Sequence, residues 1–178
     1  MRYKTVLADP PWPERGAGKI KRGADRHYKL MTIKDITEYM KQLPYDDNCH
    51  LYMWVTNNYL KDGIQIINDI GFRYITNIVW MKDRFGLGQY YRGQHELLLF
   101  AVKGRLPYRS KSETSVIIAK RRKHSEKPRE QYIKIEAVSH PPYLEVFARK
   151  KREGWNSWGD EVDKSYENNT SSIDKYLS

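Results

Sequence analysis

The sequence predicts an α/β protein with a mostly parallel sheet and helices on both faces of that sheet. Short apolar segments typical of strands alternate along the chain with segments whose apolar residues recur at helical spacing. This alternation favours parallel strands, because a helix supplies the crossover that two parallel strands need. One predicted strand, residues 96–102, is almost wholly apolar, as strands covered on both faces are.

Each element is predicted from its own pattern. Thr32 is a suitable N-cap for the first helix, with Asp35 three residues later and Pro44 closing the segment. Gly71 ends the second helix and Pro128 begins the third. The predicted strands are residues 3–7, 50–56, 72–81, 96–102, 115–119 and 143–148, the predicted helices are residues 32–43, 57–70 and 128–137, and residues 154–161, rich in Gly and Trp, are expected to form a loop.

Length and composition restrict the class of protein. A chain of 178 residues suits one domain, predicted at residues 1–162, followed by a polar tail at residues 163–178. The net charge of +10 favours a polyanionic partner, most simply nucleic acid, although a solvated basic surface has the same composition. Cys49 is the single cysteine, which excludes a disulfide framework and a cysteine-rich zinc site. Without a membrane-spanning run or a signal peptide, we expect a cytoplasmic protein that binds no metal.

The segment Asp9-Pro10-Pro11-Trp12 carries the clearest chemical signal. It directly follows the first predicted strand, and two consecutive prolines cannot continue a sheet ladder and fix the backbone beyond it. The segment therefore presents a carboxylate, carbonyl oxygens with no competing N–H in the proline run, and an indole plane. These groups suit a flat, amino-bearing heterocycle at the carboxyl end of a strand. The alternative is that Asp9 is a helix cap or a surface carboxylate.

Two loops at the expected mouth of this site combine basic and aromatic residues. Their contacts with a nucleic acid would go mainly to phosphate, and the rings suit base stacking. The first loop contributes Arg15, Lys19, Lys21, Arg22, Arg26, His27 and Tyr28, and the second contributes Arg84, Tyr90, Tyr91 and Arg92. Residues 120–123 add a further basic cluster. The alternative for the first loop is a solvated segment without a ligand.

Further motifs accompany the Asp-Pro-Pro-Trp segment in a fixed order. They occupy residues 80–82, 88–98, 124–128, 144–149, 154–155 and 158–161. With residues 9–12 they resemble the S-adenosylmethionine-dependent adenine N(6)-methyltransferases of the DPPW type, the family of the eukaryotic messenger-RNA adenosine methyltransferase and of short bacterial and phage relatives. The resemblance covers residues 1–162. It implies a Rossmann-like methyltransferase fold with a permuted motif order, in which the catalytic motif comes first and the cofactor strand last.

The two ligands of such an enzyme would meet at the first strand. Asp9, Pro10, Pro11 and Trp12 would form the catalytic half, where the Asp9 carboxylate and the Pro10 carbonyl accept the two hydrogens of the adenine amine and Trp12 stacks on the base. For S-adenosylmethionine the resemblance and the strand ends indicate Asp9, Ser125, Lys127, Glu145, Arg149, Asn156, Gly159, Asp160 and Glu161. The resemblance places Lys127 at the methionine carboxylate. Two alternatives stay open: Glu145 could pair structurally with Arg149, and the basic run that starts at Arg149 could be merely solvated.

The favoured substrate is adenine in DNA, because compact basic members of this family without RNA-binding additions resemble bacterial or phage enzymes. An RNA adenosine methyltransferase is the alternative within the same class. A catalytically silent nucleic-acid-binding subunit is the alternative from another class. A small-molecule N-methyltransferase fits the basic loops less well. A homodimer or a partner subunit is compatible with the sequence.

Overall fold

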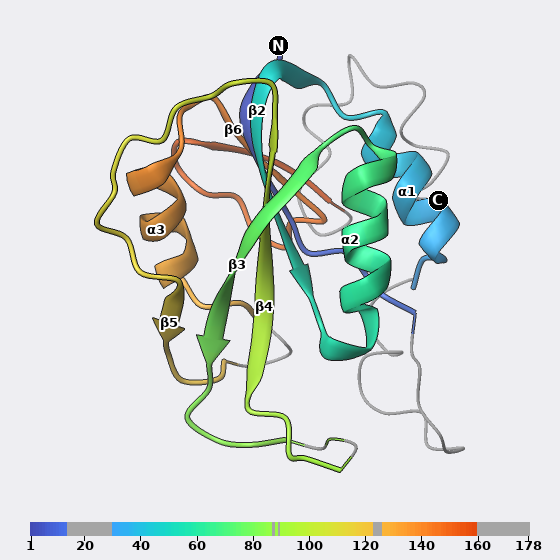
Figure 1. Ribbon diagram of the computed structural model, residues 1–178, viewed down its shortest axis with the longest axis vertical. Coiled ribbons are helices and arrows are strands. Elements are labelled where there is room, and N and C mark those ends of the chain that lie inside the picture. The colour runs from blue at the N-terminus through green and yellow to red at the C-terminus, as the bar shows by residue number, and fades with distance from the viewer. Residues whose placement is uncertain (14–29, 87, 89, 123–125, 160–178) are drawn as a thin grey trace.

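The computed structural model describes residues 1–13, 30–86, 88, 90–122 and 126–159. Within these residues the chain forms one seven-stranded sheet in the order β5-β3-β4-β2-β1-β6-β7 (Figure 1). The strands are β1 (Tyr3–Ala8), β2 (Tyr45–Val55), β3 (Arg73–Met81), β4 (His95–Lys103), β5 (Val116–Ile118), β6 (Tyr143–Val146) and β7 (Trp155–Trp158). The helices are α1 (Ile33–Lys41), α2 (Leu60–Asp69) and α3 (Glu130–Val138), with a short 3-10 segment, η2 (Asn57–Tyr59), before α2.

Most of these strands run in the same direction. β1 is parallel to β2 and β6, β6 is parallel to β7, and β3 is parallel to β5. β4 is antiparallel to both of its neighbours, β2 and β3. The carboxyl ends of the parallel strands therefore meet at one edge of the sheet, and the amino end of β4 joins them there. We call this the ligand edge, because ligands of α/β proteins bind at the carboxyl ends of the strands.

The two faces of the sheet bury separate cores. Successive side chains of a strand point to opposite faces, so neighbouring residues divide between the cores. Val6 and Met53 pack with α1 and α2, whereas Leu7 and Trp54 pack on the side of α3. Figure 1 shows α1 and α2 on one side of the sheet and α3 on the other. Asp9, two residues beyond Leu7, accordingly falls on the α3 side.

The structure confirms the predicted fold class, a mostly parallel sheet with helices on both faces. The expected helix ends are also present. The Thr32 hydroxyl accepts a hydrogen bond from the Asp35 N–H at 3.1 Å, and the Asp35 side chain bonds back to Thr32, which completes a capping box. Gly71 follows α2 with a φ of 82°, a left-handed conformation that glycine adopts without a Cβ penalty.

One strand was missed and another begins earlier than predicted. The loop expected at residues 154–161 contains β7, because Trp155 is 6% exposed and stacks on Tyr143 of the neighbouring strand at 4.8 Å. β2 begins at Tyr45, before the expected start at residue 50, because the buried Tyr45 ring packs against Phe72 at 4.9 Å. None of the helices that the structure describes is long and apolar enough to cross a membrane.

Candidate active site

Asp9 and the two prolines lie at the carboxyl end of β1, in the interior of the sheet between β2 and β6. The backbone beyond the strand is fixed at two points. The Trp12 N–H donates to the Pro10 carbonyl at 2.8 Å, and the Met31 N–H donates to the Pro11 carbonyl at 3.1 Å. The prolines themselves have no N–H, and the donors to their carbonyls come from Trp12 and from the returning chain. A carbonyl oxygen has a second lone pair, so the Pro10 carbonyl retains acceptor capacity for a ligand.

Trp12 is held by its edge and by one face. The indole Nε1 donates to the Trp54 carbonyl at 3.0 Å. The Tyr59 ring stacks on the indole with 5.2 Å between centroids and an interplanar angle of 14°, and the Tyr59 hydroxyl bonds to the Pro13 carbonyl. Tyr59 therefore occupies one face of the indole, and Trp12 also packs against the core on the α1 and α2 side.

Four side chains at the ligand edge alternate in charge; we call them the charge chain (Lys82, Glu96, Lys127 and Asp9). The Lys82 ammonium lies 2.5 Å from Glu96, which in turn lies 3.5 Å from the Lys127 ammonium. Lys127 then lies 2.8 Å from the Asp9 carboxylate. Glu96 reaches this edge because β4 runs antiparallel to its neighbours and begins there, with Glu96 opposite Trp80 of β3.

The charge chain sets the protonation of its central members. Burial opposes a charge on Lys127, but the carboxylates of Asp9 and Glu96 outweigh it and raise the pKa of Lys127. Burial likewise opposes ionisation of Glu96, but Lys127 and Lys82 outweigh it and lower the pKa of Glu96. Lys127 is therefore a cation at neutral pH. Its side chain is 12% exposed, so water and salt screen its ion pairs with Asp9 and Glu96 only weakly.

Glu145 on β6 is a further carboxyl group at this edge. The Tyr132 hydroxyl lies 3.0 Å from each of the two Glu145 oxygens, and the Arg152 guanidinium stacks on the Tyr132 ring at 4.1 Å. Burial is the main reason that the pKa of Glu145 rises to about 7; the charge of Asp9 adds to it, against the opposing hydrogen bond from Tyr132. Because this pKa lies near neutral pH, a cationic ligand would shift Glu145 to its ionised form.

A cavity of about 480 Å³ brings these groups together. Four residues predicted to bind the cofactor, Asp9, Lys127, Glu145 and Arg149, lie in its wall. Leu7, Trp54, Glu126, Arg129, Gln131, Tyr132, Phe147, Lys150, Lys151 and Arg152 complete the lining. No group of three or more His, Cys, Asp or Glu side chains among the described residues could hold a metal ion.

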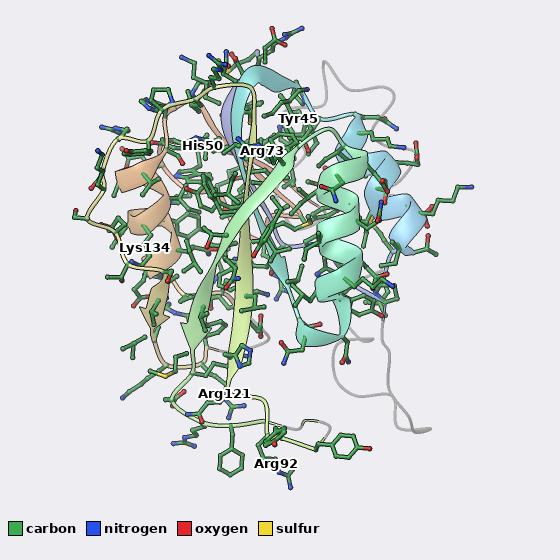
Figure 2. All side chains as sticks on the ribbon, in the orientation of Figure 1. Tyr45, His50, Arg73, Arg92, Arg121 and Lys134 are labelled. Atoms are coloured by element: carbon green, nitrogen blue, oxygen red, sulfur yellow. The ribbon has the colours of Figure 1, made fainter. Side chains whose placement is uncertain are left out.

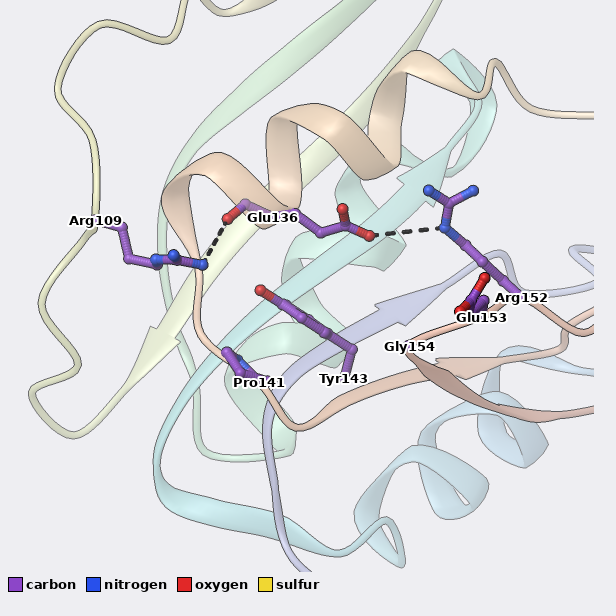
Figure 3. Close-up of a pocket in the computed structure, with 7 residues that line it drawn as sticks. All are labelled: Arg109, Glu136, Pro141, Tyr143, Arg152, Glu153 and Gly154. Atoms are coloured by element: carbon purple, nitrogen blue, oxygen red, sulfur yellow. Dashed lines mark hydrogen bonds and ion pairs between the residues drawn. The ribbon is translucent and has the colours of Figure 1, made fainter.

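A second cavity, of about 560 Å³, has Arg152 in its wall as the first cavity does. Figure 3 shows its two arginines, Arg109 and Arg152, on opposite sides of Tyr143. The Arg109 guanidinium donates to the Glu136 carbonyl at 3.1 Å, and Arg152 lies 3.7 Å from the Glu136 carboxylate. With Glu153 also in the wall, two cations face two carboxylates. This balance gives the second cavity no net attraction for an anion, and the first cavity is therefore the candidate site.

Other predicted cofactor residues lie elsewhere. Asn156 is opposite Leu144 in the β6–β7 register, which directs it to the α1 and α2 side, where its amide donates to the Tyr3 hydroxyl at 2.6 Å. Gly159 packs against the backbone of Ala148, and a Cβ at Gly159 would lie 2.3 Å from the Ala148 carbonyl oxygen. The structure therefore does not bring Asn156 to the cavity, and it gives Gly159 a packing role. Ser125, Asp160 and Glu161 lie outside the described residues.

The second predicted nucleic-acid loop connects β3 to β4 and extends from the ligand edge (Figure 1). Arg84, Tyr90, Tyr91 and Arg92 are exposed on it. The backbone N–H of Arg121, from the predicted basic cluster, donates to the Asp83 carboxylate at 2.9 Å, so this cluster adjoins the loop. The remaining predicted residues, Arg15, Lys19, Lys21, Arg22, Arg26, His27 and Tyr28, lie outside the described residues.

Sequence reasoning gave no role to several side chains of the site. Lys82 and Glu96 belong to the family motifs, but their pairing depends on the register between β3 and β4. Tyr132 lies in the first turn of α3 and lines the same cavity as Lys127, which precedes the helix, and no sequence spacing signals this. Trp54 lies beneath the Lys127 ammonium, 5.6 Å from its ring centroid, and its indole donates to Gln131 at 2.7 Å.

The fold and the ligand edge define a Rossmann-like methyltransferase with an Asp-Pro-Pro-Trp strand end. The chain belongs to the MT-A70 family, whose model matches residues 3–161. This confirms the family expected from the motifs, that of the adenine N(6)-methyltransferases.

The alignments of this chain with individual relatives cover different shares of each relative's length. The type II methyltransferase M.MunI of Mycoplasma sp is 26% identical over 185 residues, which cover 90% of this chain and 78% of that protein. The N(6)-adenosine-methyltransferase catalytic subunit METTL3 of Homo sapiens is 28% identical over 91% of this chain and 28% of that protein. The N6-methyladenosine RNA methyltransferase MTA1 of Cryphonectria parasitica is 27% identical over 90% of this chain and 52% of that protein. The chain thus spans most of M.MunI but about half or less of the other two.

Proposed function

We propose that the chain transfers a methyl group from S-adenosylmethionine to the exocyclic amine of adenine in DNA. The observation that carries this proposal is the position of Asp9. It ends β1 with the proline carbonyls following it and with Lys127 2.8 Å from its carboxylate, in the wall of the cavity. One carboxylate thus lies between a backbone suited to a flat amine and a cavity suited to a charged cofactor.

The cavity fits the proposed cofactor in size and in charge. A volume of about 480 Å³ falls within the range of small-molecule sites. Lys127 would bind the carboxylate of the cofactor just before α3, where helix N–H groups also favour an anion. Glu145 and Asp9 would face the cationic groups. When bound, S-adenosylmethionine supplies an electrophilic methyl group on its sulfonium sulfur.

The catalytic segment would act by positioning and electrostatics. The adenine amine is a weak nucleophile because its lone pair is delocalised into the ring. If the Asp9 carboxylate and the Pro10 carbonyl accept its two hydrogens, the nitrogen becomes pyramidal and its lone pair faces the cavity. No strong base is needed before transfer, because the cationic product amine loses its proton readily. Trp12, whose indole is held by the Tyr59 ring, would stack on the base.

Two considerations favour DNA as the substrate. The chain covers 78% of a type II methyltransferase, whereas it covers 28% and 52% of relatives named for adenosine or RNA methylation. The family resemblance also associates compact basic members with bacterial and phage enzymes. An RNA adenosine methyltransferase remains the second candidate, because the adenine amine is the same group in both nucleic acids.

A tritiated-methyl transfer assay would test the proposal on matched single-stranded DNA, duplex DNA and RNA of one sequence. We expect label in the adenine of DNA. Preferential labelling of the RNA would favour the second candidate. Binding of nucleic acid without transfer to any of the three would instead indicate a silent subunit and refute the proposal.

A further inference from the structure

We propose that the hairpin at residues 82–94, between β3 and β4, is a stacking surface for unpaired bases beside the target adenine, so that the preferred substrate is single-stranded or locally opened nucleic acid. This inference rests on the proposed function, because it requires a nucleic acid at the ligand edge. It starts from three exposed rings: Tyr90 is fully exposed at 105%, Tyr91 is 88% exposed and Phe85 is 63% exposed. Large apolar groups gathered in water commonly mark a binding site.

The stem of the hairpin is an ordered continuation of the two strands. The Lys82 N–H donates to the Gln94 carbonyl at 2.9 Å, and the Gln94 side chain donates back to the Lys82 carbonyl at 3.0 Å. Further out, the Gly86 N–H donates to the Gly93 carbonyl at 2.7 Å. The rings are therefore carried by a backbone that is paired well beyond β3 and β4.

The backbone is closely packed at Gly88. A Cβ at Gly88 would lie 2.0 Å from the Tyr91 carbonyl oxygen, so the position requires glycine. Tyr90 has a φ of 59°, in the left-handed region that aromatic residues rarely adopt. Strained backbone tends to concentrate at functional positions. Here it coincides with two rings that contribute nothing to the core.

Exposed basic side chains lie on the same hairpin and beside it. Arg84 is 79% exposed, and Arg92 and Arg121 are exposed as well. Figure 2 shows Arg92 and Arg121 at the same end of the molecule, at and beside the hairpin. The Asp83 carboxylate, which accepts from the Arg121 N–H at 2.9 Å, ties that segment to the stem. This combination of cations and flat rings matches a strand that offers phosphates and bases together.

The base of the hairpin is linked to Asp9 through the charge chain. Lys82 at one end of it and Glu96 just beyond the other are both members of the charge chain that ends at Asp9. The base of the hairpin and Asp9 therefore lie at the same ligand edge. Nucleotides that neighbour a target adenine at Asp9 would lie where the hairpin extends from the ligand edge.

Unpaired bases suit this surface better than an intact duplex does. Base faces are covered in a duplex by the neighbouring pairs, whereas a single strand offers each face to an aromatic side chain. A target adenine must also leave the duplex before its amine can enter an enzyme site, which loosens its neighbours. A second copy of the chain fits less well, because two surfaces that each carry exposed guanidinium groups repel one another.

The test separates base contacts from phosphate contacts. Fluorescence anisotropy would measure binding of the full chain to a labelled single strand of about 12 nucleotides and to an abasic strand of equal length, which keeps the phosphates. We expect the parental protein to bind the base-bearing strand at least about tenfold more tightly. The Tyr90→Ala/Tyr91→Ala variant should lose most of this preference, measured as the ratio of the dissociation constants for the abasic and the base-bearing strand.

Matched variants control for charge and for folding. Arg92→Gln should weaken binding of both strands by a similar factor and reduce the salt dependence. The Tyr90→Phe/Tyr91→Phe variant should keep the parental ratio, since both rings remain. Tyr108→Ala, which removes a ring that is 54% exposed outside the hairpin, should leave both dissociation constants unchanged.

Three results would overturn the inference. They are an unchanged binding ratio in the Tyr90→Ala/Tyr91→Ala variant, tighter parental binding to intact duplex than to the single strand, and a change of oligomeric state in that variant by light scattering. Methyl transfer is measured separately. If no nucleic acid is methylated while the ring-dependent ratio persists, the proposed function fails and the stacking surface stands.

Discussion

Replacing Lys127 with methionine would remove the central cation of the charge chain and keep a side chain of similar length. Lys127 lies 2.8 Å from Asp9 and 3.5 Å from Glu96, and its side chain is 12% exposed. Glu96 retains Lys82 at 2.5 Å, whereas Asp9 loses the cation bonded to it. The substitution should therefore act chiefly by leaving Asp9 without its counter-charge.

The expected loss of stability follows from the burial of this pair. Removing one partner of a buried ion pair costs about 3–5 kcal/mol. The Asp9 side chain is 23% exposed, so water recovers part of that cost, and we expect Lys127→Met to lower the free energy of unfolding by about 2 kcal/mol at pH 7. Asp9→Asn removes the stranded charge, so the double variant should be about 1 kcal/mol more stable than the two single losses predict.

Urea unfolding followed by tryptophan fluorescence would measure all four proteins of this cycle. Calorimetric titration with S-adenosylmethionine would give the second readout, where Lys127→Met should weaken binding. Lys134→Met is the matched control, since Lys134 is another little-exposed lysine, 2.9 Å from Glu113 and outside the cavity lining. Additive single losses, within about 0.5 kcal/mol, would refute the ion-pair argument. Unchanged cofactor affinity would refute the binding role.

Three further predictions concern single positions. Asp9→Ala should lower the methyl-transfer rate by a factor of about 10²–10³ while cofactor affinity stays within about tenfold, and a parental rate would reject the assignment. Because burial raises the pKa of Glu145 from 4.5 to about 7, the folded state retains a proton there that the unfolded state has lost, and stability should fall as the pH rises across that interval. The Glu145→Gln variant should lack this decline when melting temperatures are compared at about pH 5 and pH 8, and identical pH profiles would contradict it. Gly159→Ala should lower the free energy of unfolding by about 1–3 kcal/mol, because its Cβ would lie 2.3 Å from the Ala148 oxygen. Gly86→Ala is the control, since its Cβ would lie 3.6 Å from the nearest atom and only the backbone freedom of the unfolded chain changes. Equal urea midpoints for the two variants would contradict the packing argument.

Local sequence patterns predicted most of the fold because the strands and helices carry clear periodicity. Thr32, Asp35 and Gly71 mark helix ends by local chemistry that needs no tertiary information. The strand β7 was missed because Trp155–Trp158 has only four residues and two of them are polar. Its strand conformation depends on pairing with β6 and on burial of Trp155, both of which are tertiary.

The same division applies to the site. Asp9 and Glu145 could be placed at the ligand edge because each lies at or near the end of a predicted strand. The contact of Glu96 with Lys127 could not be predicted, because this contact depends on the direction of β4 and on the register of β4 with β3. The hydrogen bond from Tyr132 to Glu145 depends on how α3 is rotated over the sheet.

The hydrogen bond between the Met31 N–H and the Pro11 carbonyl joins the chain on either side of residues 14–29. The backbone leaves the strand end and returns to it at a fixed point, and the entropy of closing a loop grows slowly with its length. Insertions or replacements in the intervening segment can therefore leave Asp9 and the prolines in place. The position of Asp9 thus depends on where the two ends of that segment meet and not on the length of chain between them.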